Sequence, residues 1–368
     1  MARSKVVIVG AGPAGLAAGA CLQQCGINAA IFEAGEAPGT TWTSLYDRLH
    51  LHTMKSLSGL PLWPMPRHYP RYPSRQQFAE YLTKYAHHFN LDITTRCKVE
   101  RATHDEEGWL LTTPQGERRA DVIVSATGIF THPMPPEYPD TAVYQGQSLL
   151  ARDYHNAAPF SGQRVLVVGA GNTGAEIAID LAEAGVAVTS SIRAGTNIVP
   201  RDLAGVPIQV WGQIIARTPR RLTDVLTPVL LRRSVQRQAR AGVPRSALGV
   251  LDSPGIPIIG LDFPRLAQRG SIVIAGAIER FTSTGVRFAN GSEASFDAVI
   301  FATGYRLATD YLDVQLPLDQ RGHLEAEAVK RAEANGLYFI GTNYDIRGTL
   351  FNIRHEAPKL AATIAAHP

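Results

Sequence analysis

The stretch SKVVIVGAGPAG, Ser4–Gly15, decides the fold of this chain. An apolar, β-branched run leads directly into the pattern G-x-G-x-x-G, and a helical pattern of small residues follows it. This order is typical of a strand, a tight glycine loop and a helix that bind a dinucleotide. Gly10 is expected to make the turn, Gly12 to let the backbone approach a pyrophosphate, and Gly15 to let the helix pack closely.

The same plan occurs a second time along the chain. QRVLVVGAGNTG, Gln163–Gly174, repeats the strand and the loop, with Gly169, Gly171 and Gly174 in the three glycine positions. DVIVSATG (Asp121–Gly128) is likewise matched by DAVIFATG (Asp297–Gly304). One G-x-G-x-x-G is a weak signal, whereas two in matching context predict an α/β fold with two Rossmann-like dinucleotide-binding domains.

The residues that end the second strand of each half differ. INAAIFE ends in Glu33, eighteen residues past Gly15, where a carboxylate accepts hydrogen bonds from an adenosine ribose. This acid suits FAD or NAD and disfavours a 2′-phosphate. VAVTSSIR ends instead in Arg193, whose guanidinium can fork onto a phosphate, so the second half should prefer NADPH over NADH. Asn172 and Thr173 add hydrogen-bonding side chains to the second loop.

Length and composition narrow the class of protein. A chain of 368 residues with a net charge of +4 suits two globular domains, and its few Lys/Arg clusters do not predict a nucleic-acid binder. Three cysteines supply neither a disulfide framework nor a zinc-ligand set, and no metal site is expected. The N-terminus resembles a signal peptide, but its glycines fit a dinucleotide loop better. No apolar run reaches the length of a transmembrane segment, so a cytoplasmic protein is expected.

Between these motifs three further segments can be interpreted. SRQQFAEYLTKYAHHF begins with Ser74 and Gln77 as a capping-box pair and continues as an amphipathic helix. The proline-rich piece before it, residues 61–73, is expected to be an ordered loop or lid. Residues 202–255 read as a mostly helical insertion without a dinucleotide motif. Its basic, apolar part, Ile214–Ala241, suits a packed or solvated helix, a membrane surface or a dimer partner.

Three stretches resemble the motifs of class B flavin-dependent monooxygenases. EAGEAPGTTW resembles that family's E-x5-G-G-x-W stretch, and YQGQSLLARDY keeps the spacing of its fingerprint F-x-G-x3-H-x3-(Y/F). ATGY, Ala302–Tyr305, matches the strand that returns the chain to the FAD domain. The segment from Tyr46 to Leu82 is more similar to the plant YUCCA-type branch than to the animal drug-oxidising branch. The resemblance covers nearly the whole chain in the right order.

The resemblance implies FAD and NADPH as cofactors and a cycle with little acid–base chemistry by the protein. NADPH reduces FAD, O2 adds at the flavin C4a, and the (hydro)peroxyflavin transfers one oxygen atom to a small organic substrate. His52 is the candidate active-site residue, at a position that bears Asn in many members and His in the YUCCA branch. Lys55 is a weaker candidate for a phosphate or flavin contact.

The domain boundaries and cofactor contacts follow from the motifs and the resemblance together. Residues 1–157 and 297–368 are expected to form the FAD-binding domain, and residues 158–296 the NADPH-binding domain, which includes the insertion. The candidate cofactor contacts are Gly10, Gly12, Pro13, Ala14, Gly15, Glu33, Thr41, Trp42, Val99, Gly128, Gly169, Gly171, Asn172, Thr173, Gly174, Arg193 and Gly304. Arg201 is a further candidate that could equally be a solvated surface residue.

The chain also departs from the family pattern. Leu150 replaces the fingerprint His, Tyr144 its leading Phe, Thr40 the second glycine after Gly39, and Met54 a usual Pro. Leu can neither donate nor accept a hydrogen bond, so any contact made by that His is absent. The hypothesis is that the oxygenated flavin is shorter-lived here, or that another residue substitutes.

Several functions remain open from the sequence. The substrate of a monooxygenase could be an amine, a sulfide, a ketone or a 2-oxo acid, with Phe351, Asn352 and Arg354 of a closing loop shaping the pocket. One alternative is an NADPH:flavin oxidoreductase or NADPH oxidase that passes electrons to O2 or to a partner. Another is a non-catalytic dinucleotide-binding sensor, which two complete loops argue against. A homodimer is possible.

Overall fold

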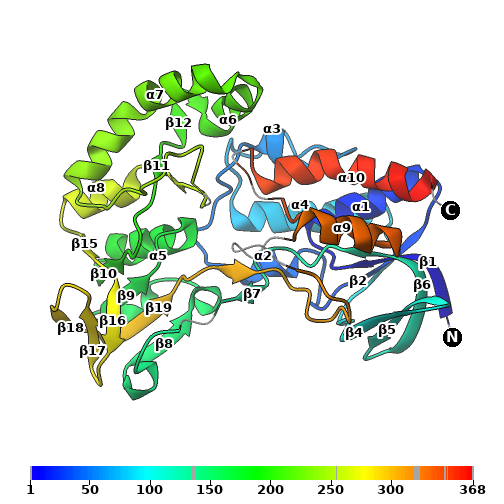
Figure 1. The fold of residues 1–368 in the computed structure, drawn as a ribbon, viewed down its shortest axis with the longest axis horizontal. Coiled ribbons are helices and arrows are strands. Elements are labelled where there is room, and N and C mark those ends of the chain that lie inside the picture. The colour runs from blue at the N-terminus through cyan, green and yellow to red at the C-terminus, as the bar shows by residue number, and fades with distance from the viewer. Residues whose placement is uncertain are drawn as a thin grey trace. The chain divides into compact units, whose positions relative to one another are not determined.

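The computed structural model describes residues 2–134, 137–253, 255–317, 324–343, 345 and 347–366. The chain divides into two compact units. Unit 1 contains Met1–Ser44, Thr53–His132 and Tyr305–Pro368, and unit 2 contains Leu45–His52 and Pro133–Gly304. Each unit has its own sheet with a parallel core and helices, which confirms the predicted α/β class with two Rossmann-like domains (Figure 1).

Unit 1 is built on a seven-stranded sheet in the order β3-β2-β1-β6-β5-β4, with β21 beside β6. The β1–β2, β2–β3, β1–β6 and β6–β21 pairs are parallel, and the β4–β5–β6 edge is antiparallel. The strands are β1 (Ala2–Val9), β2 (Ala29–Phe32), β3 (Ile93–Thr94), β4 (Arg101–Asp105), β5 (Gly108–Thr113), β6 (Gly116–Ser125) and β21 (Leu337–Phe339). Val6, Val7 and Ile8 of β1 are fully buried, as a strand covered on both faces requires.

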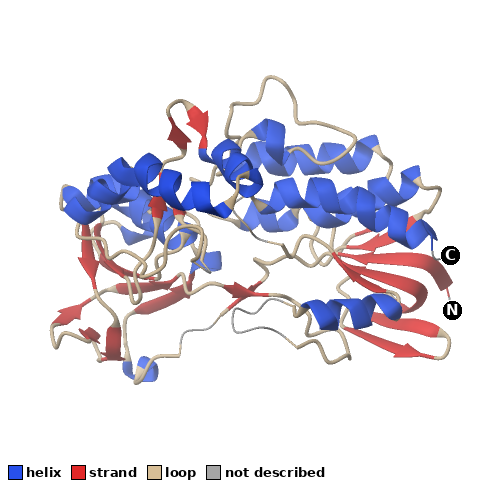
Figure 2. Cartoon of the chain, turned by 45° about the horizontal axis from the view of Figure 1, so that its top comes forward, coloured by secondary structure: helices blue, strands red, loops and turns tan. Residues whose placement is uncertain are grey.

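The helices of unit 1 lie over this sheet, where α1 packs against α10 and α4 (Figures 1 and 2). They are α1 (Pro13–Gln24), α2 (Thr40–Ser44), α3 (Lys55–Ser58), α4 (Arg75–His88), α9 (Ala326–Ala334) and α10 (Thr349–Ala366). The predicted capping box at the start of α4 is confirmed, because Ser74 Oγ accepts from the backbone N–H of Gln77 and the Gln77 side chain accepts from the backbone N–H of Ser74. Phe78, Tyr81 and Tyr85 of α4 are fully buried.

Unit 2 contains a five-stranded, all-parallel sheet in the order β15-β10-β9-β19-β8. The strands are β8 (Gln147–Leu150), β9 (Arg164–Val168), β10 (Ala187–Ser191), β15 (Ile272–Ala275) and β19 (Ala298–Phe301). Helix α5 (Asn172–Glu183) packs on β9 and β10, and α8 (Asp262–Gln268) on β15. An antiparallel sheet of β16 (Ile278–Phe281), β17 (Gly285–Phe288) and β18 (Glu293–Ser295) belongs to the same unit.

The insertion in unit 2 begins with a short hairpin and continues as two helices. β12 (Asp202–Leu203) pairs with β13 (Val206–Pro207), and α6 (Ile208–Arg217) and α7 (Arg220–Arg240) follow. β11 (Ile198–Val199) pairs with β14 (Ile258–Ile259) beneath α7. The remaining elements are β7 (His132–Pro133), β20 (Tyr305–Arg306) and the 3-10 turns η1 (Thr141–Val143), η2 (Ala151–Asp153) and η3 (Ala158–Phe160).

The two compact units do not coincide with the expected domain boundaries. Residues 45–52 and 133–157, expected within the FAD-binding domain, pack with unit 2. The chain changes unit beside Pro133 and again after Gly304, close to the second ATG motif. The functional boundaries at 157/158 and 296/297 therefore stay a prediction.

Candidate cofactor and active site

The first glycine loop is fixed by close contacts at two of its three glycines. Gly10 has a φ of +105°, and a Cβ there would lie 2.6 Å from the carbonyl oxygen of Ala126. A Cβ at Gly15 would lie 1.9 Å from the carbonyl oxygen of Gly10. Both positions require glycine for packing. A Cβ at Gly12, in contrast, would have no heavy atom within 4 Å.

The second loop repeats this geometry. Gly169 has a φ of +114°, and a Cβ there would lie 2.3 Å from the carbonyl oxygen of Ala302. A Cβ at Gly174 would lie 2.3 Å from the carbonyl oxygen of Gly169, whereas one at Gly171 would again meet nothing within 4 Å. The alanine of each ATG motif thus closes against the first glycine of its loop. In each loop the second glycine borders open space.

The open space at Gly12 and Gly171 lies at the N-terminus of a helix. Gly12 and Gly171 are the extended N-cap residues of α1 and α5, and no side chain of the described residues caps either helix. The first-turn N–H groups of such a helix favour an anion. Pro13 and Ala14, and Thr173 in the second half, belong to these first turns. Both loops therefore fit the pyrophosphate of a dinucleotide.

Glu33 is held beside the first loop by two short hydrogen bonds. Its carboxylate accepts 2.7 Å bonds from the backbone N–H groups of Ala11 and Gly35. The side chain is half-buried at the end of β2. Because an ionised carboxylate accepts about four hydrogen bonds, two acceptor sites remain for the hydroxyls of a ribose. The predicted contact of Glu33 with a ribose stays a prediction, and these two bonds hold its carboxylate beside the first loop.

The other residues of unit 1 that were predicted to contact FAD range from exposed to buried. The Gly39 N–H donates to the Ala11 carbonyl oxygen at 2.9 Å, which brings the start of α2 to the first loop. Thr41 is exposed on α2, and Trp42 packs edge-on against Phe78, with ring centroids 4.4 Å apart. Val99 is buried in an apolar cluster with Val9 and Phe32, so only its backbone is available to a ligand. Gly128, with a φ of +77°, ends the first ATG motif.

Arg193 is exposed and follows the end of β10. Its positive charge acts on Tyr138. Burial raises the pKa of Tyr138, and the charge of Arg193 partly offsets this rise. Tyr138 itself packs on Phe281 and Phe301. An exposed guanidinium beside a half-buried aromatic ring suits an adenosine 2′-phosphate. Gly304, with a φ of +101°, ends the second ATG motif.

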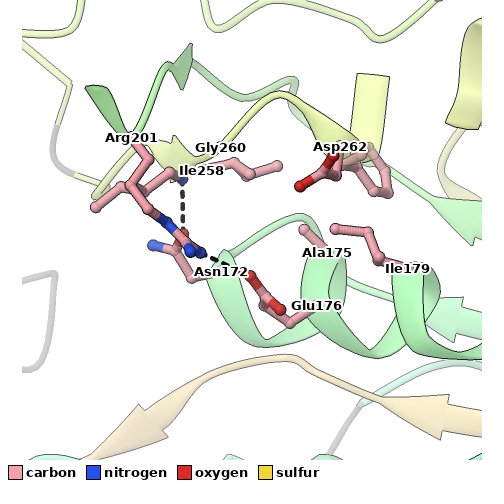
Figure 3. A pocket seen from close by; sticks show the side chains of 10 residues that line it. Asn172, Ala175, Glu176, Ile179, Arg201, Ile258, Gly260 and Asp262 are labelled. Atoms are coloured by element: carbon pink, nitrogen blue, oxygen red, sulfur yellow. Dashed lines mark hydrogen bonds and ion pairs between the residues drawn. The ribbon is translucent and has the colours of Figure 1, made fainter. Parts of the chain in front are cut away.

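A small pocket adjoins the first turns of α5 (Figure 3). The Asn172 side chain forms one wall, since its Nδ2 donates to the Pro257 carbonyl oxygen at 3.1 Å and its Oδ1 accepts from the Ile259 N–H at 2.8 Å. These bonds give Asn172 a structural role, and its predicted cofactor contact stays a prediction. The pocket is lined by Asn172, Ala175, Glu176, Ile179, Arg201, Ile258, Ile259, Gly260, Asp262 and Phe263.

Glu176, on the wall of this pocket, joins two arginines that are distant in sequence. Arg48 Nε lies 3.2 Å from Glu176 Oε2, and Arg201 lies 3.7 Å from Glu176 Oε1. Arg48 also pairs with Glu183, which lies about two turns further along the same face of α5. Burial raises the pKa of Glu176, whereas both arginines lower it. The ion pairs of Arg48 with Glu176 and Glu183 attach residues 45–52 to α5.

The Arg48–Glu176 pair could not be predicted from the sequence. The one local signal was an acid within the apolar helical run AEIAIDLA, where a buried carboxylate needs a cationic partner. Nothing in the sequence near Glu176 identifies that partner, because Arg48 lies 128 residues away.

His52 ends the segment that this cluster holds. Its imidazole is half-buried, and its Nδ1 is buried without a hydrogen-bond partner among the described residues. Burial, together with electrostatic repulsion from Arg201 and His50, lowers the pKa of His52 to about 4. At neutral pH the ring is therefore uncharged, with one nitrogen as donor and the other as acceptor. It can bind a ligand by hydrogen bonds but cannot act as a cation.

The fingerprint segment makes structural contacts within unit 2. The Tyr144 hydroxyl donates to the Phe296 carbonyl oxygen at 2.9 Å, and the Tyr154 hydroxyl donates to Asp180 on α5 at 2.5 Å. Leu150 ends β8, pairs with Phe301 and packs half-buried against the apolar cluster that contains Tyr144 and Phe281. The aromatic positions of the fingerprint therefore anchor the segment, and Leu150 extends the core.

Lys55 and the three predicted pocket residues near the C-terminus have surroundings that differ from those expected. Lys55 Nζ donates to the Arg67 carbonyl oxygen at 2.6 Å and to that of Tyr69. Its ammonium group is therefore hydrogen-bonded to the backbone of the proline-rich loop. Phe351, Asn352 and Arg354 lie in α10 and not in a loop. Phe351 and Asn352 are buried, and Arg354 donates to the Ser56 carbonyl oxygen at 2.9 Å. The helix begins at Thr349, earlier than expected, and packs against α1.

Metal-ligand clusters and membrane-spanning helices are both absent from the described residues. No cluster of three or more His, Cys, Asp or Glu side chains there could hold a metal ion. No helix in the described ranges is long and apolar enough to cross a membrane.

Comparison with known proteins gives consistent matches. The family model described as FMO-like, flavin-binding monooxygenase-like, matches residues 3–322. "Probable indole-3-pyruvate monooxygenase YUCCA1" of Arabidopsis thaliana is 33% identical over 310 residues, which cover 82% of this chain and 75% of that protein. "Indole-3-pyruvate monooxygenase YUCCA8" of Oryza sativa subsp. japonica is 32% identical over 98% of this chain and 90% of its own length.

Solved structures extend the likeness to the whole fold. The flavin-containing monooxygenase from Stenotrophomonas maltophilia has a TM-score of 0.77 at 25% identity, covering 100% of this chain and 99% of that one. An oxidised steroid monooxygenase bound to NADP has a TM-score of 0.75 at 18% identity, covering 99% of this chain and 86% of that one. At that identity the second likeness concerns the fold alone.

Proposed function

Since this chain belongs to the family of flavin-binding monooxygenase-like proteins, we propose that it catalyses the oxidative decarboxylation of a 2-oxo acid with an apolar or aromatic side chain. The support for this substrate class is the similarity to indole-3-pyruvate monooxygenases over most of the chain. The reaction consumes the 2-oxo acid, O2, NADPH and a proton. It yields the acid shortened by one carbon, CO2, water and NADP+.

The broader activity follows from family membership. The chain is an oxidoreductase that uses FAD, NADPH and O2 to place one oxygen atom in a small organic substrate. When bound, the flavin reduced by NADPH supplies the chemistry that activates O2. The protein binds both dinucleotides, orients them and excludes water.

The single observation that carries the cofactor assignment is the pair of open positions at Gly12 and Gly171. Each position borders a helix N-terminus and follows a parallel strand, so each loop has space for one dinucleotide pyrophosphate. We assign FAD to the loop with Glu33 because a carboxylate repels a 2′-phosphate. We assign NADPH to the loop with Arg193, whose exposed guanidinium attracts that phosphate.

His52 is proposed to hold a neutral hydrogen-bonding position in the active site. With a pKa of about 4, its ring keeps one N–H and one lone pair at neutral pH. Its buried Nδ1 has no partner among the described residues, which leaves that nitrogen for the substrate or the nicotinamide end of NADP. The Arg48–Glu176 pair orients the segment that carries it.

The test is an NADPH-consumption assay with purified, FAD-loaded protein. Indole-3-pyruvate, phenylpyruvate and 4-methyl-2-oxopentanoate are compared with an amine, a sulfide and a cyclic ketone, in the presence of ¹⁸O2. The expected product is the acid shortened by one carbon with one ¹⁸O atom, detected by mass spectrometry. Oxygen transfer to the amine, sulfide or ketone with no decarboxylation of any 2-oxo acid would refute the substrate class and keep the monooxygenase assignment.

Leu150 favours a second candidate, an NADPH oxidase that passes electrons to O2. The apolar packing of Leu150 leaves no hydrogen-bonding group at the position of the fingerprint His. The two functions separate in the amount of H2O2 formed per NADPH consumed. A monooxygenase forms less H2O2 when its substrate is present, whereas an oxidase forms one H2O2 per NADPH with every compound tested.

The location and the oligomeric state of the protein are further parts of the proposal. We propose that the protein works in the cytoplasm, where NADPH is supplied, and that it forms a homodimer. Fractionation of cells and analytical ultracentrifugation check the two statements independently of activity.

A further inference from the structure

Helix α7 packs on unit 2 through its polar face. Its buried side chains recur at helical spacing, and all but one are polar: Thr223, Thr227, Leu231, Ser234 and Gln238. Ser234 Oγ donates to the Ile198 carbonyl oxygen at 2.7 Å, and Gln238 Nε2 donates to that of Thr196 at 2.7 Å. Hydrogen bonds to the backbone around β11 therefore attach this helix to its unit.

The outward face of the same helix is apolar in its first half. Leu222, Val225, Leu226 and Val229 follow the i, i+3, i+4, i+7 spacing of one helical stripe, and their exposed fractions are 55%, 66%, 52% and 68%. Ile214 of the preceding helix α6 is 50% exposed. The usual arrangement, with apolar side chains inward and polar ones outward, is thus reversed in α7. We call this stripe, Leu222 to Val229, the apolar stripe.

Positive charge is concentrated on the same two helices. Residues 208–240 contain seven arginines, one aspartate and no lysine or glutamate, whereas the whole chain has a net charge of only +4. The remaining residues are therefore slightly acidic. The single acid, Asp224, lies 2.7 Å from Arg220 Nε. Arg232 and Arg233 are exposed and continue α7 beyond the apolar stripe.

We propose that the apolar stripe and its arginines bind the surface of an anionic lipid membrane, with α7 lying in the plane of the headgroups. An apolar stripe with adjoining basic residues gains both from burial and from anionic headgroups. A second copy of this chain would bring two such clusters together, and their like charges would repel. A nucleic acid would match the charge but would leave the apolar stripe in water.

The experiment is flotation of the FAD-loaded protein with vesicles of phosphatidylglycerol and phosphatidylcholine in equal parts, compared with vesicles of phosphatidylcholine alone. We expect binding to the anionic vesicles only, and weaker binding as salt is raised. The triple variant Leu222→Ser, Val225→Ser, Val229→Ser should lower the partition coefficient by roughly tenfold or more. Arg232→Gln with Arg233→Gln should lower it by about fivefold for each charge removed.

Matched controls test whether the position on α7 matters. Val143→Ser with Val273→Ser removes two exposed valines elsewhere in unit 2, and Arg269→Gln with Arg280→Gln removes two exposed arginines elsewhere. Both controls should bind as the parent chain does, and circular dichroism verifies that every variant folds. The proposal is overturned if the parent chain ignores anionic vesicles or if the controls lose binding equally. It is also overturned if the triple variant dissociates a dimer in ultracentrifugation, or if the parent binds DNA more tightly than the vesicles.

Discussion

The two glycine loops share their backbone geometry and differ in the charge that follows. In both, the first and third glycines are packed against backbone carbonyls, and the second borders open space at a helix N-terminus. After the first loop comes Glu33, held by the N–H groups of Ala11 and Gly35. After the second comes Arg193, which is exposed. Steric contacts thus require the first and third glycine of each loop, whereas the proposed choice of dinucleotide rests on the charge of one side chain after each loop.

The two charged groups also differ in how the protein holds them. Glu33 is fixed by two 2.7 Å bonds before any ligand binds, which suits a cofactor that is held permanently. Arg193 is exposed, so under the proposed assignment its side chain would be ordered by the phosphate itself, which suits a nucleotide that binds and leaves. The comparison predicts separable defects when one half is changed.

The largest expected effect comes from filling the open positions. Gly12→Val should weaken FAD binding by more than about 100-fold, because a branched side chain would occupy the space of the pyrophosphate. Gly171→Val should leave FAD bound and raise the KM for NADPH by a similar factor. Flavin absorbance after reconstitution and NADPH titration measure the two effects, and each variant is the control of the other. Loss of both cofactors in either variant would contradict the assignment.

The next effect concerns the choice between NADPH and NADH. Arg193→Gln removes a charge-assisted bond to the 2′-phosphate, so the KM for NADPH should rise about 30-fold while that for NADH stays constant. Steady-state kinetics with both nucleotides measure this ratio. Arg269→Gln, which removes another exposed arginine of unit 2, should change neither value. An equal rise for both nucleotides would show that Arg193 does not contact the phosphate.

Glu33→Gln should have a smaller effect, confined to FAD. A neutral amide has one acceptor oxygen, so it cannot serve both the Ala11 and Gly35 N–H groups, and FAD affinity should fall about tenfold. Fluorescence titration of the apoprotein with FAD measures it. Glu36→Gln, which changes an exposed acid three residues away, is the matched control. A raised KM for NADPH in Glu33→Gln would contradict the separation of the two halves.

The smallest expected effect is a pH dependence of stability that comes from His52. This residue precedes most of unit 1 in the sequence but packs in unit 2. Its folded pKa of about 4 lies below the unfolded value of about 6.5, so the unfolded chain binds the extra proton between those values. Stability is therefore lost as the pH falls, by about 1 kcal/mol between pH 7.5 and pH 5.5.

Urea unfolding at the two pH values measures this loss. His52→Asn should reduce the difference between them, whereas His87→Asn, at an exposed histidine, should preserve it. An unchanged difference in His52→Asn would mean that His52 is solvated in the folded protein.

The family and the order of the motifs could be predicted from the sequence, because each motif is contiguous. A β-branched run, three glycines at fixed spacing and a charge at the end of the next strand form one local unit whose geometry neighbouring residues dictate. The capping box of α4 was predictable for the same reason. The flavin monooxygenase resemblance, carried by such motifs, is confirmed by the family model and the relatives.

Other features required the fold. The clamp on Glu33 joins residues 22 apart, and the Arg48–Glu176 pair joins residues 128 apart. The burial of Val99 and the reversed faces of α7 depend on which surface each segment packs against. Periodicity shows that a helix has two faces but not which of them the rest of the chain covers. The sequence by itself determined the two dinucleotide loops and their charges, since these depend on local sterics. Only the tertiary structure decided which backbone groups hold Glu33, that Arg48 pairs with the distant Glu176, and which apolar surface stays exposed, since all three depend on long-range packing.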